Sequence, residues 1–178
     1  MTNNINAKAA LDALLSNLCI NPICYQHPPL ATCDDADKLN LQRQGARIKN
    51  LFLRDNYGRR HFLLLTTPEK KVDLKQLSKQ LSISRLGFAS AERLHKYLRV
   101  TPGSVSLLAL INDTEHKVEL LMDDDIWQQR AFQCHPLLNT ETYVLTKAQC
   151  INFLKATGHE VGVILLPAVI APSSDELS

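Results

Sequence analysis

Two apolar stretches, residues 46–54 and 60–66, stand close together in the chain, separated by Asp55-Asn56-Tyr57-Gly58. Apolar runs of this length flanking a segment rich in Asp, Asn and Gly are typical of a β-hairpin. Alternate residues of a strand share a face, so Lys49 lies with Leu51 and Leu53, whereas Asn50 lies with Ile48 and Phe52. The pattern predicts a hairpin with apolar side chains on both faces and one polar residue near the start of each face.

Leucines at helical spacing predict an amphipathic helix over residues 6–18, which Asn21-Pro22 ends. Capping residues predict three more helices. Asp73 begins one over residues 74–81, Ser90 begins one ending near Arg99, and the box Thr146–Gln149 begins one that Gly158 ends. We also expect a short helix over residues 33–41, capped by Thr32 or Asp34, and capping of a helix at Ile126-Trp127 by Asp123-Asp124-Asp125.

Further short strands are predicted at six places along the chain: residues 23–27, 86–89, 118–122, 132–134, 142–145 and 159–166. Strands and helices alternate without the regular rhythm of a doubly wound sheet. We therefore expect one mixed α/β (α+β) domain over residues 1–166, in which helices surround a mixed sheet. Residues 167–178 read as a loose tail.

Charge is divided unevenly along the 178 residues, although the formal net charge is only +2. Residues 43–99 hold 14 lysines and arginines against four acidic residues, a net charge of +10, whereas residues 101–178 hold four against ten. This division is typical of a protein with one face for phosphates, and also of two well-solvated lysine-rich helices. On the charge pattern alone both interpretations stay open.

The chain has no apolar run long enough to span a membrane and no signal-peptide pattern at its start. Its five cysteines are irregularly spaced and include no CxxC pair, which favours reduced thiols over disulfides or a zinc site at Cys19, Cys24, His27 and Cys33. We expect a cytoplasmic protein without metal or cofactor.

Three places could carry chemistry. Lys49 either reaches the sheet edge or points into a cleft, where its ammonium would bind an anion or polarise a carbonyl. The segment from Thr101 to Ser106 is either an ordinary loop or a nest of backbone amides. His135 either orients a substrate at a strand end or is structural. No GxSxG, HExxH or P-loop motif is present, so an enzyme here would use few protein groups.

Several motifs, in order, resemble the YbaK/prolyl-tRNA-synthetase-associated editing domain family, over about residues 5–165. The motifs are His27-Pro28-Pro29, Lys49-Asn-Leu-Phe-Leu-Arg-Asp55, Phe88-Ala-Ser-x-Glu-Arg-Leu94, Val100-Thr-Pro-Gly-Ser-Val-Ser106, Leu110-Ile-Asn-Asp113 and His135-Pro-x-x-Asn-Thr-x-Thr142. The resemblance is strongest to the freestanding branch of the family, which hydrolyses Ala-tRNA(Pro). It implies a pocket for the 3′-terminal aminoacyl-adenosine of a mischarged tRNA.

The same resemblance assigns site residues. Lys49 matches the pocket lysine and His135 the pocket histidine, and both would be catalytic. Gly103 begins the family's GxxxP loop, whose amides hold the substrate, but Leu107 stands where the pattern has proline, which leaves the preferred amino acid open. The substrate-binding residues would be Asn50, Gly103, Ser104, Val105, Ser106, Asn112, Pro136, Asn139 and Thr140.

The implied function is trans-editing, the hydrolysis of mischarged Ala-tRNA(Pro) by a positioned water. An aminoacyl ester is already activated, so orientation and oxyanion stabilisation suffice without a metal or a covalent nucleophile. The expected partner is the acceptor end of the tRNA, whose phosphates would meet the basic segment. Prolyl-tRNA synthetase is a second candidate partner, and we expect a monomer. Two alternatives remain, a deacylase for Cys- or Ser-tRNA and a non-catalytic tRNA-binding or regulatory module.

Overall fold

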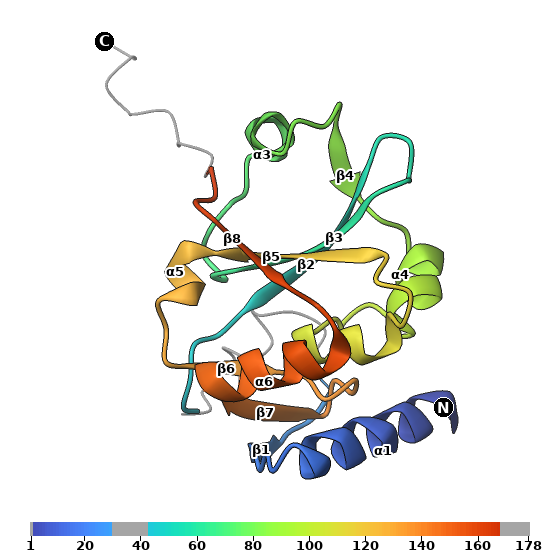
Figure 1. Ribbon diagram of the computed structural model, residues 1–178, viewed down its shortest axis with the longest axis vertical. Coiled ribbons are helices and arrows are strands. Elements are labelled where there is room, and N and C mark those ends of the chain that lie inside the picture. The colour runs from blue at the N-terminus through green and yellow to red at the C-terminus, as the bar shows by residue number, and fades with distance from the viewer. Residues whose placement is uncertain (1, 30–42, 168–178) are drawn as a thin grey trace.

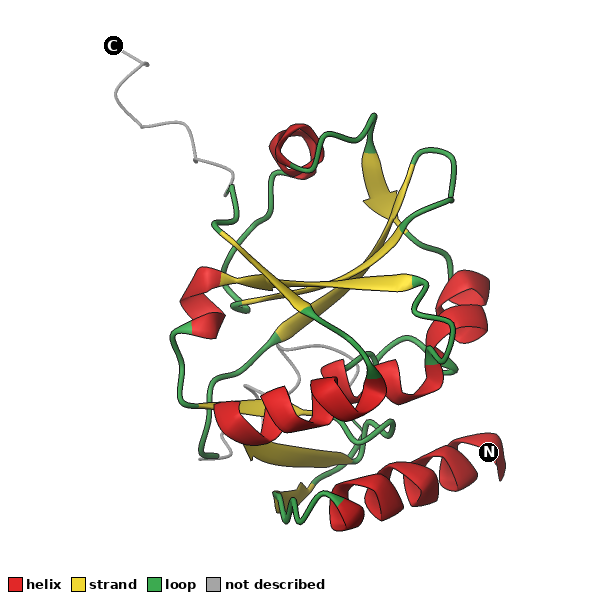
Figure 2. Ribbon diagram, viewed as in Figure 1, coloured by secondary structure: helices red, strands yellow, loops and turns green. Residues whose placement is uncertain are grey.

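A computed structural model describes residues 2–29 and 43–167 and divides the strands between two sheets (Figures 1 and 2). The smaller sheet is antiparallel, in the order β1 (Ile23–Gln26), β7 (Glu141–Thr146), β6 (Ala131–Cys134). The larger is mixed, in the order β4 (Leu86–Phe88), β2 (Lys49–Asp55), β3 (His61–Thr66), β5 (Val118–Asp123), β8 (Val161–Ile164). The mixed α+β class is confirmed, with two sheets in place of the single one expected.

The hairpin of β2 and β3 forms as predicted, with Lys49 opposite Thr66 at its open end. At the turn, one carboxylate oxygen of Asp55 accepts the backbone N–H groups of Arg59 (2.7 Å) and Arg60 (3.1 Å). Gly58 supplies the positive φ (65°) that the turn requires. Burial would raise the pKa of Asp55, but these backbone donors outweigh it and lower the pKa.

The helices begin and end close to their predicted positions. They are α1 (Thr2–Asn17), α3 (Leu74–Gln80), α4 (Ala91–Leu98), α5 (Asp124–Trp127) and α6 (Lys147–Thr157). The caps of Asp73 and Ser90, the box at Thr146 and the left-handed Gly158 are all confirmed. The helix expected over residues 33–41 and the tail beyond residue 167 lie outside the described residues.

The capping role predicted for the aspartate run is wrong for Asp123, whose side chain makes no capping hydrogen bond to α5. Its buried carboxylate accepts the hydroxyl of Thr66 (2.8 Å) and pairs with the ammonium of Lys70 (2.6 Å). Lys70 also reaches Asp125 (2.7 Å). The run therefore anchors the segment that follows β3.

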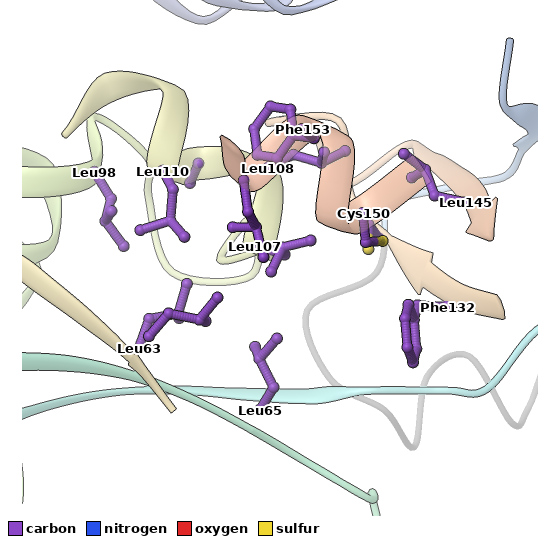
Figure 3. Packing of buried hydrophobic residues seen from close by; sticks show 14 of the residues in the cluster. Leu63, Leu65, Leu98, Leu107, Leu108, Leu110, Phe132, Leu145, Cys150 and Phe153 are labelled. Atoms are coloured by element: carbon purple, nitrogen blue, oxygen red, sulfur yellow. The ribbon is translucent and has the colours of Figure 1, made fainter. Parts of the chain in front are cut away.

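A 3-10 helix, η1 (Leu107–Asn112), was not predicted, and its buried residues help to join the two sheets. Figure 3 shows Leu107 between Leu63 and Leu65 of β3 and the α6 residues Cys150 and Phe153. The same core cluster reaches Phe132 of β6, whereas the alternate residues of β3 pack with α3 in a second cluster. Both faces of the hairpin are thus buried, as the sequence pattern predicts.

Helix α1 packs on the three-stranded sheet, at the end of the molecule opposite α3 (Figure 1). The Lys8 ammonium donates to Asp12 (2.6 Å) and to the hydroxyl of Tyr143 on β7 (2.9 Å), and that hydroxyl donates to Asp12 (2.8 Å). Burial opposes the charge of Lys8, but these partners outweigh it and raise the pKa of the lysine. Among the described residues no helix is long and apolar enough to cross a membrane.

Candidate functional site

The segment that leads into β2 forms a parallel bridge with β6, and one predicted catalytic residue follows this bridge on each side. Ala46 bridges Phe132: its N–H donates to the carbonyl of Ala131 (2.8 Å), and its carbonyl accepts the N–H of Gln133 (2.9 Å). Lys49 and His135 each stand three residues beyond this bridge. These two residues are 86 positions apart in the sequence, and Lys49 shares the face of β2 that packs toward α3, whereas Asn50 lies on the face toward η1.

The half-buried Lys49 takes neither of the orientations weighed from the sequence alone. Its ammonium donates to the backbone carbonyls of Pro68 (2.9 Å) and Lys70, in the segment that follows β3. An ammonium has three donors, so these two bonds fix its direction and leave one N–H. The salt bridge from Lys70 to Asp123 holds the accepting carbonyls in place.

The loop before η1 begins with a tight turn. Ser104 N–H donates to the carbonyl of Thr101 (3.0 Å), and Gly103 has a φ of 87°, as expected of a type II turn with Pro at its second position. Ser106 caps η1 by accepting the N–H of Leu108 (3.2 Å). Within the described residues, the N–H groups of Gly103, Val105 and Ser106 donate to no protein atom.

Leu107, which replaces the proline of the family pattern, is the first residue of η1, and only 1% of its surface is exposed. Proline is compatible with the first position of a helix, so the loop shape does not depend on which of the two residues stands there. The Leu107 side chain adds core volume, and the cap by Ser106 holds the loop.

His135 follows β6 and is fixed by one hydrogen bond, between its Nδ1 and the carbonyl of Glu141 (3.0 Å). A carbonyl only accepts, so Nδ1 carries the hydrogen and Nε2 of the neutral ring is an acceptor. Burial lowers the pKa of His135, and the nearby His27 and Arg43 lower it further, against the opposing effect of the Glu141 carbonyl. The site thus favours a neutral imidazole.

The loop after His135 contains three other predicted site residues. Pro136 is buried, whereas Asn139 and Thr140 are half-buried. The carbonyl of Thr140 accepts the N–H of His27 (3.0 Å), which attaches this loop to the end of β1.

The two remaining predicted residues make contacts within the protein. Asn50 lies on the face that packs toward η1, and its amide reaches the carbonyl of Ile48 (3.4 Å). The Asn112 amide donates to the carbonyl of Leu98 (2.9 Å), so it links η1 to α4. Asn112 therefore has a structural partner in this arrangement.

Sequence reasoning missed the group beside His135. The Nε2 of His27 lies 2.9 Å from the Thr142 hydroxyl, which also accepts Nη1 of Arg43 (3.2 Å). The His27 and His135 ring centroids are 6.2 Å apart. His27 and Thr142 were both visible in the motifs, but their contact spans 115 positions, and no local pattern indicates it.

The basic segment is partly neutralised by the acidic part of the chain. Arg60 forms a two-bond pair with Glu119 (2.7 Å each), and Lys70 is paired as described above. Other basic residues on the hairpin turn, α3, α4 and the start of β4 are exposed: Arg59, Lys75, Lys79, Arg85, Lys96 and Arg99. In Figure 1 the hairpin turn, α3 and β4 lie at the end opposite the three-stranded sheet. No group of three or more His, Cys, Asp or Glu side chains in the described part of the chain could hold a metal ion.

Comparison with known proteins identifies the family. The model of the aminoacyl-tRNA editing domain matches residues 27–153, a range that contains Lys49, the Gly103 loop and His135. The chain belongs to the aminoacyl-tRNA editing domain family. This membership confirms the resemblance drawn from the motifs and the predicted enzyme class, an aminoacyl-tRNA editing enzyme.

Two relatives are similar to this chain over most of its length. A protein named prolyl-tRNA editing protein ProX, from Acetoanaerobium sticklandii, is 35% identical over 163 residues, 92% of this chain and 99% of its own. Prolyl-tRNA synthetase associated domain-containing protein 1 from Danio rerio is 32% identical over 157 residues, 87% of this chain and 85% of its own.

Solved structures confirm the fold alone. The crystal structure of a candidate trans-editing enzyme for prolyl-tRNA synthetase has a TM-score of 0.66 at 15% identity, over 90% of this chain and 96% of that one. A hypothetical protein has a TM-score of 0.67 at 14% identity, over 88% of this chain and 99% of that one.

Proposed function

We propose that this protein is a trans-editing deacylase that hydrolyses Ala-tRNA(Pro). The observation that carries the proposal is the position of Lys49 and His135, each three residues beyond the bridge between Ala46 and Phe132, in a chain of the editing family. The 35% identity to a prolyl-tRNA editing protein, over nearly the whole of both chains, supports proline tRNA as the carrier.

The proposed chemistry needs a positioned water and a place for negative charge. The remaining N–H of Lys49 stabilises the oxyanion that forms when water attacks the ester carbonyl. The amides of Gly103, Val105 and Ser106 hold the aminoacyl-adenosine, with Asn50, Ser104, Pro136, Asn139 and Thr140 around it. Neutral His135 orients the water through Nε2. Asn112 supports the loop through its bond to Leu98. No metal, cofactor or covalent intermediate takes part in this scheme.

The preference for alanine follows from how synthetases make errors. A pocket built for proline rejects the smaller alanine weakly, because each missing methylene costs only about 1–3 kcal/mol. A second site that admits alanine and excludes proline by size restores the discrimination. We favour alanine over cysteine or serine as the residue removed because the motifs most resemble the branch of the family that hydrolyses Ala-tRNA(Pro).

The tRNA stem would extend from the site toward the hairpin turn. β2 has seven residues and rises about 3.3 Å per residue, so the turn is about 20 Å from Lys49. The exposed Arg59, Lys79 and Arg85 lie toward that end and would meet phosphates. Binding of tRNA should then weaken steeply with salt, and replacing these three residues by Gln should flatten the slope. We expect a cytoplasmic monomer that meets tRNA(Pro) free or on prolyl-tRNA synthetase.

The test is deacylation of Ala-, Cys-, Ser- and Pro-tRNA(Pro) by the purified protein, each measured as loss of labelled amino acid. The proposal expects Ala-tRNA(Pro) to be hydrolysed fastest and Pro-tRNA(Pro) to survive. Faster loss of the Cys or Ser ester would assign a different small residue to the same chemistry. Tight binding of all four without hydrolysis would indicate a non-catalytic tRNA-binding module and would overturn the proposal.

A further inference from the structure

His27 is held from two sides next to His135. Its Nδ1 lies 2.9 Å from the carbonyl of Pro28, and its Nε2 lies 2.9 Å from the hydroxyl of Thr142. Both side chains are buried, with 8% of His27 and 3% of Thr142 exposed. The same hydroxyl accepts Nη1 of Arg43 (3.2 Å). The side chains of His27 and Arg43, from two separate segments of the chain, therefore converge on the hydroxyl oxygen of Thr142.

The partners determine where the hydrogens lie. The Pro28 carbonyl can only accept, so Nδ1 of His27 donates and its Nε2 accepts when the ring is neutral. The Thr142 hydroxyl then donates to His27 and accepts from Arg43, so the hydroxyl acts once as donor and once as acceptor.

We propose that Arg43, Thr142 and His27 form a positioning relay that keeps His135 neutral, with the lone pair of Nε2 directed to the attacking water. This inference rests on the proposed function and deepens it. The Nε2 of His135 takes a proton as the water oxygen bonds to the ester carbon. It returns that proton to the ribose oxygen as the carbon–oxygen ester bond breaks. The products are the free amino acid and a tRNA with its 3′-terminal hydroxyl restored.

The charged groups around His135 agree with this role. His27 faces it from the end of β1, and Arg43 faces it from the segment before β2. Glu141 of β7 offers its backbone carbonyl, while its carboxylate lies 3.5 Å from the Lys8 ammonium. Among these described neighbours no carboxylate stabilises a His135 cation, whereas an arginine and a second imidazole oppose one.

Thr142 offers a matched pair of variants. Thr142→Val keeps the shape and removes the hydroxyl, and Thr142→Ser keeps the hydroxyl. Losing one hydrogen bond of the relay should lower kcat for Ala-tRNA(Pro) about 3- to 10-fold in the Val variant, with KM unchanged. The Ser variant should recover most of kcat. Equal kcat in the two variants, or a loss confined to KM, would overturn the relay. Urea unfolding of both variants shows whether the loss of kcat exceeds any loss of folded protein.

Arg43→Gln tests the electrostatic part of the relay through the titration of His135. Removing the arginine should raise the pKa of His135, so the acid limb of the kcat profile should move to higher pH. The matched control is Arg130→Gln, which removes the same charge at an exposed position before β6 and should leave that limb in place. An unmoved limb in Arg43→Gln, or an equal shift in both, would refute the inference.

The two proposals fail differently. NMR titration of the His135 ring follows its pKa without substrate, in the wild type and in Arg43→Gln. A higher pKa in the variant supports the relay, and an unchanged pKa contradicts it, whatever the activity. Absence of deacylation by the wild type, with the titration as expected, would instead overturn the proposed function.

Discussion

Replacing Asp123 by Asn perturbs the segment that holds Lys49 without touching the lysine itself. One carboxylate oxygen of Asp123 accepts from the Thr66 hydroxyl (2.8 Å) and contacts the Lys70 ammonium (2.6 Å), and only 1% of that side chain is exposed. The backbone carbonyls of Pro68 and Lys70 in turn accept from Lys49. Weakening the bond between Asp123 and Lys70 should therefore let those carbonyls shift and release the lysine from its direction.

The magnitude follows from which contacts survive. The Asn side chain still accepts from Thr66, and Lys70 keeps its pair with Asp125 at 2.7 Å. What is lost is the buried negative charge opposite Lys70, and a hydrogen bond between charged groups contributes about 1.5–3 kcal/mol. Asp125→Asn is the matched control, because Asp125 binds the same ammonium but is 63% exposed. An exposed pair of this kind contributes about 1 kcal/mol or less.

The assay is urea unfolding of the wild type and both variants, with deacylation measured on the same samples. Asp123→Asn should lower the free energy of unfolding by about 1.5–3 kcal/mol. It should also lower kcat well beyond the change in Asp125→Asn. Equal losses of stability in the two variants would refute the reasoning about burial. A destabilised Asp123→Asn protein with wild-type kcat would show that the segment does not position Lys49.

Three further predictions concern stability. Leu107→Ala should cost about 2–5 kcal/mol by urea unfolding, because the side chain is 1% exposed in the core, and a loss below about 1 kcal/mol would refute that packing. Tyr143→Phe removes the hydroxyl between Lys8 and Asp12 and should cost about 0.5–1.5 kcal/mol; an unchanged midpoint would contradict its role in docking α1. Asp55 has a lowered pKa in the folded state, so its ionised carboxylate stabilises the fold at neutral pH. That contribution is lost as the pH falls from about 3.9, the pKa of an unperturbed aspartate, through the lower pKa of the folded state. The stability gap between the wild type and Asp55→Asn should accordingly shrink on acidification, and a constant gap would refute the assignment.

The elements that could be predicted from the sequence are those whose signals are local. Asp73 and Ser90 cap helices through backbone groups two or three residues away, so the residue type and its position suffice. Gly58 allows the hairpin turn in the same local way. The 3-10 helix at residues 107–112 could not be predicted, because a short run of apolar residues has the same pattern in a strand, a helix or a turn.

The division into two sheets and the details of the site depend on distant contacts. The bridge between Ala46 and Phe132 carries no pattern in either segment, yet it joins the segments that lead to Lys49 and to His135. The ammonium of Lys49 is fixed by backbone carbonyls, which every residue has, so no sequence motif indicates them. Motif resemblance found the two catalytic candidates, whereas the contacts that orient them required the structure.

Lys49 is proposed to take part in the hydrolysis of a mischarged tRNA, and the rate of that hydrolysis tests its role. Single-turnover deacylation of Ala-tRNA(Pro) is measured for the wild type, Lys49→Ala and Lys155→Ala, where Lys155 is an exposed lysine of α6. We predict hydrolysis by the wild type and by Lys155→Ala, with a rate at least about tenfold lower in Lys49→Ala, as expected when an oxyanion donor is lost. Hydrolysis by Lys49→Ala at the wild-type rate, or intact Ala-tRNA(Pro) with all three proteins, would contradict it.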